Sequence, residues 1–125
     1  MSHDNIIARR ILIADEDEDA VEILGLLLSL DGHEVKSALN GRTAHSIARE
    51  FQPDLILTYV GMRDIEWNEA AANFSQAAPK AKVVALIDWR QESSPARWRD
   101  NGYHSHLIKP VELKHVKDLL EDKFI

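Results

Sequence analysis

Five short apolar runs alternate with longer segments whose apolar residues recur at helical spacing, and this alternation begins at Arg10. The runs cover residues 11–14, 33–38, 55–60, 83–87 and 106–108. Most of them are uniformly apolar, which is typical of parallel strands that are covered on both faces. The second run is the exception, because Glu34 and Lys36 flank Val35. We therefore predict that this run lies at an edge of the sheet.

The segments between and after these runs place their apolar residues on one face of a predicted helix. These faces are formed by Val21, Leu24 and Leu28, by Ala44, Ile47, Ala48 and Phe51, by Trp67, Ala70, Ala71 and Phe74, and by Leu113, Val116 and Leu120. A further helix is predicted to begin at Pro95, after the typical N-cap residues Ser93 and Ser94, and to stop at Gly102. Strands that alternate with helices through short connections predict a doubly wound α/β fold with right-handed crossovers.

The composition excludes several classes of protein. The 125 residues include 15 Lys and Arg against 21 Asp and Glu, which gives a formal net charge of −6, and they include no cysteine. This length suits one domain over residues 1–125 that needs no disulfide or thiolate metal site. An acidic chain without a basic stripe is not expected to bind nucleic acid. Because the sequence also lacks a signal-peptide core and a membrane-spanning apolar run, we expect a cytoplasmic protein without membrane contact.

The end of the first predicted strand carries the strongest chemical signal. Five acidic residues, 15–19, follow it, whereas a nucleotide-binding fold would have a glycine-rich turn there. The acids would repel phosphate and suit a divalent cation, although acidic residues at a helix N-terminus are also stabilised by the helix dipole and are often merely solvated. Lys109, followed by Pro110, ends the last buried strand and needs an anionic partner. We predict that Asp15 or Glu16 is that partner.

The whole chain resembles the receiver domain of bacterial two-component response regulators. The resemblance rests on separate motifs with agreeing spacing: Ile11-Leu12-Ile13-Ala14-Asp15-Glu16, Pro53-Asp54-Leu55-Ile56-Leu57, Val83-Val84-Ala85-Leu86, Gly102 and Leu107-Ile108-Lys109-Pro110. It implies a flavodoxin-like (βα)5 three-layer sandwich with a parallel five-stranded sheet in the order 2-1-3-4-5. It also implies that Asp15 and Glu16 are the acidic pair that holds Mg²⁺ in the family, and that Lys109 is the lysine that pairs with the phosphate, before a cis peptide bond to Pro110.

Two other positions depart from the family pattern. The alignment places Tyr59 where the phospho-acceptor Asp belongs, and Gly61 where a backbone carbonyl would ligate Mg²⁺. No shift of register restores the acceptor, because residues 55–63 contain no carboxylate. Ile87 takes the place of the Ser or Thr that senses the phosphate, and it has no hydroxyl. We therefore expect no catalytic residue, no cofactor, and at most weak Mg²⁺ binding at Asp15, Glu16 and Gly61.

The remaining site residues concern partners. His106 occupies the position, three residues before Lys109, where the family often has an aromatic residue that changes rotamer on activation. The resemblance further implies a partner-binding surface formed by the fourth helix, the fifth strand and the fifth helix. We expect Trp98, Tyr103 and His106 to lie on this surface, which would bind another signalling protein or a second copy of the chain.

These observations favour a degenerate receiver, not an enzyme, that acts through phosphorylation-independent protein binding. One alternative is a working response regulator that is phosphorylated on a displaced acid, Asp88 or Asp64. Another is a small-molecule sensor that uses the pocket vacated beside Tyr59. Treatment with a small phosphodonor, followed by mass measurement, distinguishes the first two hypotheses.

Overall fold

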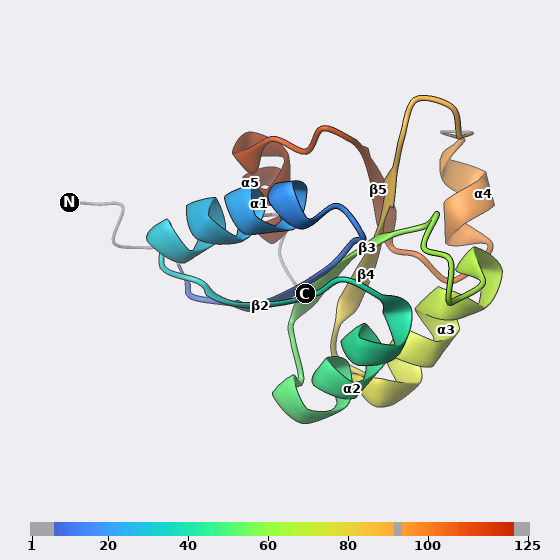
Figure 1. Cartoon of the computed structure of the whole chain (residues 1–125), viewed down its shortest axis with the longest axis horizontal. Helices are drawn as coiled ribbons and strands as arrows, with labels where there is room; N and C mark the ends of the chain where they lie inside the picture. Colours follow the sequence, from blue (N-terminus) through green and yellow to red (C-terminus); the bar gives the residue numbers. More distant parts are fainter. Residues whose placement is uncertain (1–6, 92–93, 122–125) are drawn as a thin grey trace.

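The computed structural model describes residues 7–91 and 94–121, which form a parallel five-stranded sheet. The order of its strands is β2-β1-β3-β4-β5, as predicted (Figure 1). The strands are β1 (Arg10–Ala14), β2 (Glu34–Ala38), β3 (Leu55–Tyr59), β4 (Lys82–Ile87) and β5 (Ser105–Ile108). Each predicted run agrees with its strand to within one residue at either end. β2 lies at a sheet edge, as its charged residues predicted, and β5 forms the other edge.

Five helices cover the two faces of the sheet (Figure 1). They are α1 (Glu18–Leu30), α2 (Gly41–Phe51), α3 (Trp67–Ala77), α4 (Pro95–Arg99) and α5 (Leu113–Glu121). α1 and α5 lie on one face, and α2, α3 and α4 lie on the other. The resulting three-layer arrangement is the flavodoxin-like fold that the sequence predicted.

The buried residues form two cores, one on each side of the sheet. Successive side chains of β3 alternate between them: Leu55 and Leu57 pack toward α1 and α5, whereas Ile56 packs toward α2 and α3. Each of these side chains is fully buried. Continuous burial on both faces explains why the central strands are uniformly apolar in sequence.

The loop after β3 is fastened to the N-terminus of α2. The carboxylate of Asp64 accepts hydrogen bonds from the backbone N–H groups of Gly41 and Arg42, at 2.8 and 2.9 Å. Ile65 packs against Gly41 so closely that a Cβ atom at this position would overlap its side chain. The loop that leaves the candidate site is therefore held by polar and apolar contacts together.

The prediction that Trp98 and Tyr103 lie on a partner-binding surface is wrong. Both side chains are 98% buried. Trp98 makes edge-to-face contacts with Trp67 and Tyr103, and the hydroxyl of Tyr103 donates a hydrogen bond of 2.7 Å to the backbone carbonyl of Trp67. α4 is short and packs through Trp98, so this side chain belongs to the core. Ser93 lies outside the described residues, and Ser94 precedes the helix without capping it through its side chain.

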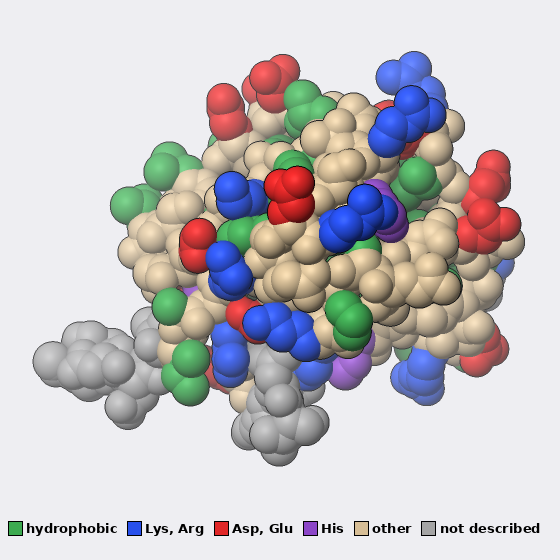
Figure 2. All heavy atoms as spheres, turned by 90° about the horizontal axis from the view of Figure 1, so that it is seen from below, with side chains coloured by type: hydrophobic (Ala, Val, Ile, Leu, Met, Phe, Trp, Pro, Cys, Tyr) green, Lys and Arg blue, Asp and Glu red, His purple; other side chains and the backbone are tan. Residues whose placement is uncertain are grey.

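Figure 2 views the molecule from the side on which α2 and α3 lie, and shows Lys and Arg side chains near the centre of this face with acidic side chains among them. Among the surface ion pairs, Arg10 lies 3.4 Å from Glu34, and Lys80 lies 3.4 Å from Asp54. Arg10 and Lys80 are therefore each balanced by a neighbouring acid. No helix in the described part of the chain has the length and the apolar character needed to cross a membrane.

Candidate functional site

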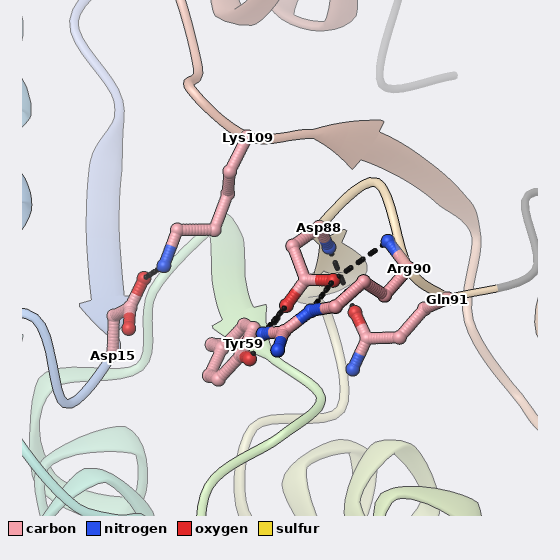
Figure 3. A network of polar contacts seen from close by, with 6 residues as sticks. All are labelled: Asp15, Tyr59, Asp88, Arg90, Gln91 and Lys109. Atoms are coloured by element: carbon pink, nitrogen blue, oxygen red, sulfur yellow. Dashed lines mark hydrogen bonds and ion pairs between the residues drawn. The ribbon is translucent and has the colours of Figure 1, made fainter.

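The candidate residues lie together at the C-terminal end of the sheet, where β1, β3, β4 and β5 end (Figure 3). Asp15 follows β1, Tyr59 ends β3, Asp88 follows β4 and Lys109 follows β5. Parallel strands place these ends side by side, which is where ligands bind in open α/β sheets.

Lys109 and Asp15 form an ion pair at the centre of the site. The Nζ atom of Lys109 lies 2.6 Å from Oδ2 of Asp15, and the two side chains are 20% and 4% exposed. The other carboxylate oxygen of Asp15 accepts a hydrogen bond of 3.1 Å from the backbone N–H of Asp17. The predicted pairing of Lys109 is therefore confirmed, with Asp15 as the partner. The Lys109–Pro110 peptide bond is cis, as the resemblance implied.

Glu16 is bound by a different part of the site. Its Oε2 atom accepts a hydrogen bond of 2.8 Å from the backbone N–H of Arg63 and lies 3.5 Å from Nε of the same residue. The second acid of the pair thus contacts the loop that follows β3.

Tyr59 lies between Lys109 and the loop that follows β4. The Nζ atom of Lys109 is 4.3 Å from the centroid of the Tyr59 ring, within the range of a cation–π contact. The hydroxyl of Tyr59 donates a hydrogen bond of 3.0 Å to Oδ2 of Asp88. The same ring packs closely over Gly61, where a Cβ atom would lie 2.6 Å from the hydroxyl oxygen. Gly61 therefore permits this placement of the Tyr59 ring.

The electrostatics of Tyr59 and Asp88 follow from this hydrogen bond and from Arg90. Partial burial, together with the bond to Asp88, raises the pKa of Tyr59 above its ordinary value, so its phenol is neutral at neutral pH. The side chain and the backbone N–H of Arg90 both bond to Asp88, and they lower the pKa of that carboxyl to about 2. Asp88 is therefore an anion with four donor groups from two residues, Tyr59 and Arg90.

The backbone of the β4–α4 loop is also fixed beside Asp88. The backbone N–H of Asp88 donates a hydrogen bond of 2.7 Å to the side-chain oxygen of Gln91. Ile87, which precedes it, is fully buried in the core on the side of α2 and α3. From the sequence, Asp88 is predicted only as a displaced phospho-acceptor, and its bond to Tyr59 is not predicted, although an acid directly after a buried strand is a usable signal. His106, on β5, is partly buried and lies beside Ala85 of β4.

The chain's own donors already satisfy the acids that would hold a magnesium ion. Lys109 engages Asp15, and Arg63 engages Glu16. At the end of β3, Tyr59 supplies a neutral phenol that packs over Gly61, and it supplies no carboxylate. Among residues 7–91 and 94–121, no three His, Cys, Asp or Glu side chains gather in a way that would hold a metal ion. This donor set does not fit Mg²⁺, which requires several oxygen ligands around one point.

Comparison with known proteins establishes the family. The profile of the response regulator receiver domain matches residues 11–121, which is most of the chain. The chain is a member of this family. The receiver domain shares its fold with a CheY-like receiver domain protein from Methanospirillum hungatei (TM-score 0.82, 19% identity, 94% of each chain covered). It also resembles a receiver domain protein from Clostridium thermocellum (TM-score 0.81, 20% identity, 93% of each chain covered).

Similar curated proteins are longer than this receiver domain. Regulatory protein AtoC of Escherichia coli is 23% identical over 112 residues, which cover 90% of this chain and 24% of AtoC. Response regulator protein VraR of Staphylococcus epidermidis is 27% identical over 120 residues, which cover 94% of this chain and 57% of VraR. The match to each relative therefore accounts for a quarter to a little over half of that protein's length.

Proposed function

We propose that this receiver domain is a pseudo-receiver, which signals by binding another protein and does not accept a phosphoryl group. The observation that carries the proposal is Tyr59, which stands at the end of β3 where the family has its acceptor Asp. In that position its neutral hydroxyl donates a hydrogen bond to the carboxylate of Asp88. Phosphorylation of a receiver requires a carboxylate nucleophile and a metal that neutralises the developing charge, and the residues around Tyr59 supply neither.

The contacts of Lys109 and Tyr59 support a function that is independent of phosphate. Lys109 already has an anionic partner in Asp15. Tyr59 already links the end of β3 to the β4–α4 loop through Asp88, whereas Ile87 offers no hydroxyl with which that loop could sense a phosphoryl group. A ligand shifts a conformational equilibrium only through interactions that differ between the two states. The loop is thus held in one arrangement by the chain's own side chains.

The displaced acids are poorly suited to accept phosphate instead. Asp88 is neutralised by Arg90 and bonded to Tyr59, and Asp64 is bonded to the N-terminus of α2. Donors that stabilise a carboxylate lower its basicity, and with it its nucleophilicity toward a phosphorus atom. The contacts of Asp88 and Asp64 therefore favour the pseudo-receiver over the alternative of a working response regulator.

The proposed partner is another signalling protein, bound at the surface formed by α4, β5 and α5. Trp98 and Tyr103 are buried, so the exposed candidates on this surface are His106, which is partly exposed, and Ile108, which is half exposed. Ile108 lies on an edge strand, whose outer backbone groups are able to pair with another chain. The absence of cysteine fits a reducing compartment, and we place this interaction in the cytoplasm.

Incubation with acetyl phosphate, followed by intact-mass spectrometry, tests the proposal. We expect no gain of a phosphoryl group by the wild-type chain, with or without Mg²⁺. A gain that disappears in Asp88→Asn or in Asp64→Asn would instead establish the displaced-acid response regulator.

In a pull-down from the native host, Ile108→Glu should lose the bound partner, whereas Arg49→Ala on α2 should retain it. Retention by Ile108→Glu would contradict the proposed surface.

A further inference from the structure

Helix α1 is apolar on its outer side as well as on the side that faces the sheet. Its inner residues Val21, Leu24 and Leu28 are buried in the core. Four further large aliphatic side chains remain exposed on the outside: Ile23 (62%), Leu26 (61%), Leu27 (38%) and Leu30 (76%). The outside of a surface helix in a globular domain is normally polar. The exposed residues therefore indicate that this side of α1 is covered by another surface.

These four residues, which we call the outer stripe, are spaced at i, i+3, i+4 and i+7. On a helix this spacing produces one continuous apolar row about 10 Å long. The row is also its own complement. When two α1 helices lie antiparallel about a two-fold axis that passes between Leu26 and Leu27, Ile23 faces Leu30 of the second copy, and Leu26 faces its Leu27. An isologous interface requires this kind of self-complementarity.

A groove lies beside one end of the outer stripe. It has a volume of about 580 Å³ and separates the N-terminal half of α1 from the segment that joins β5 to α5. Ile23 and Leu27 line one side, and Pro110 and Val111 line the other. In the antiparallel arrangement, Leu30 of the second copy reaches this end of α1. The most exposed leucine of one copy thus meets the groove of the other.

The charges around α1 favour the same antiparallel arrangement. Acidic residues stand at its beginning, including Asp19 and Glu22, and its last turn carries no basic residue of its own. Lys117 of α5 supplies a cation at that end, where its Nζ atom lies 3.7 Å from Asp31. The antiparallel arrangement brings Glu22 of one copy to the Asp31–Lys117 pair of the other, and the half-exposed ammonium of Lys117 has donors for both carboxylates. Antiparallel packing also places the positive end of each helix dipole beside the negative end of the other, which is favourable.

We propose that the outer stripe is the interface of a homodimer, in which the α1 helices of two copies pack antiparallel. This interface lies on the face of the sheet that carries α1 and α5 (Figure 1). It is therefore separate from the residues Ile108 and His106, to which we assigned the signalling partner. The dimer leaves Ile108 and His106 of both copies accessible, and its groove adjoins the candidate site through Asp15 and Lys109.

Analytical ultracentrifugation of the whole chain over a range of concentrations tests the proposal. We expect the wild-type chain to dimerise and Leu26→Glu to weaken the dimer by about ten-fold or more, because this change places a carboxylate next to the two-fold axis. The matched control is Leu39→Glu, which changes an exposed leucine between β2 and α2 and should leave the dimer intact. Circular dichroism confirms that each variant is folded. A wild-type chain that remains monomeric overturns the proposal. Equal weakening of the dimer by Leu26→Glu and Leu39→Glu also overturns it.

The register can be tested independently, because the chain contains no cysteine. A mixture of the single variants Ile23→Cys and Leu30→Cys, oxidised with glutathione disulfide, should give a disulfide-linked pair that contains one chain of each. A mixture of Ile23→Cys and Leu39→Cys should not. Equal cross-linking in the two mixtures, or none in the first, contradicts antiparallel packing.

Discussion

Lys109 connects two neighbouring side chains at the centre of the candidate site. Its ammonium contacts a carboxylate on one side and an aromatic ring on the other, at 2.6 Å from Asp15 and 4.3 Å from the centroid of Tyr59. Because the carboxylate of Asp15 is almost fully buried, it depends on this cation. The acid and the lysine that the family uses for metal and phosphate thus neutralise each other here.

Removal of the charge of Lys109 should therefore destabilise the fold. Lys109→Met keeps most of the apolar stem but leaves Asp15 without its cation, and we expect the free energy of unfolding to fall by about 1–3 kcal/mol. Lys114→Met is the matched control, because Lys114 is exposed and lies 3.9 Å from Glu112. It should change the free energy of unfolding by less than about 0.5 kcal/mol. Urea denaturation measures both, and equal values for the two variants would contradict the argument.

His33 makes the stability of the fold depend on pH. Its buried Nδ1 atom accepts a hydrogen bond of 3.0 Å from the backbone N–H of Arg9, which requires the neutral ring. Burial lowers the pKa of His33 below its ordinary value of 6.5. Below about pH 6.5 the unfolded chain therefore binds a proton that the folded chain excludes. Stability from His33 is complete above this pH and is lost as the pH falls through the lower pKa of the folded state.

Urea denaturation at about pH 7.5 and about pH 5.5 measures this effect, because carboxylates titrate mainly below this range. We expect the wild-type chain to lose more stability between the two values than His33→Gln, which keeps an acceptor but does not titrate. The same loss in both chains would show that the proton binds elsewhere.

At the scale of elements, Asp64 joins the β3–α3 loop to the N-terminus of α2. Partial burial alone would raise the pKa of Asp64, but the backbone donors of Arg42 and Gly41 outweigh it and lower the pKa. Asp64→Ala should reduce the free energy of unfolding by about 0.5–2 kcal/mol, as the loss of a helix cap does, and Asp64→Asn should cost less. Thermal denaturation at neutral pH compares them. Equal losses in the two variants would indicate that the charge, and not the hydrogen bonds, dominates, because both variants remove the charge.

Gly41 tests the apolar part of the same connection. Gly41→Ala should destabilise the fold, because the added methyl group overlaps the side chain of Ile65. The double variant Gly41→Ala/Ile65→Ala removes that overlap and should recover part of the loss, in spite of the smaller side chain at position 65. Additive losses in the thermal denaturation of the double variant would show that the two residues do not oppose each other.

The success of prediction from sequence also differs between elements. The strands were predictable because burial on both faces leaves a uniformly apolar run, and β2 because Glu34 and Lys36 break that run. α4 begins at Pro95, as predicted, but its five residues are too few to display a helical period, and Trp98 was therefore assigned to the surface. In the site, the pairing of Lys109 followed from the cost of an isolated buried charge. The bond between Tyr59 and Asp88 joins residues 29 positions apart and depends on side-chain geometry that no local pattern records.

At the scale of the whole molecule, the site connects four strands through side chains alone. Asp15, Lys109, Tyr59, Asp88 and Arg90 form a chain of contacts across the edge of the sheet (Figure 3). Each member neutralises or satisfies its neighbour. If the chain is a pseudo-receiver, as we propose, a carboxylate at position 59 alone should not be enough for phosphate signalling.

Variants at Tyr59 and Ile87 test this expectation. Tyr59→Asp adds a carboxylate beside Asp15 and Glu16 and removes the phenol from above Gly61, so we expect tighter Mg²⁺ binding than in the wild-type chain. It should not restore switching, because Ile87 still offers the β4–α4 loop no hydroxyl for a phosphoryl oxygen. Switching should require the double variant Tyr59→Asp/Ile87→Thr.

Tryptophan fluorescence follows both events, because the exposed Trp89 is two residues from Ile87. Mg²⁺ titration should change the signal of Tyr59→Asp, and acetyl phosphate should produce a further change only in the double variant. Tyr59→Phe is the control, since it breaks the bond to Asp88 without adding a carboxylate: it should alter the loop signal but not respond to Mg²⁺ more strongly than the wild-type chain. If the wild-type chain binds Mg²⁺ as tightly as Tyr59→Asp, the internal cations do not block the site, and the role assigned to Tyr59 is wrong.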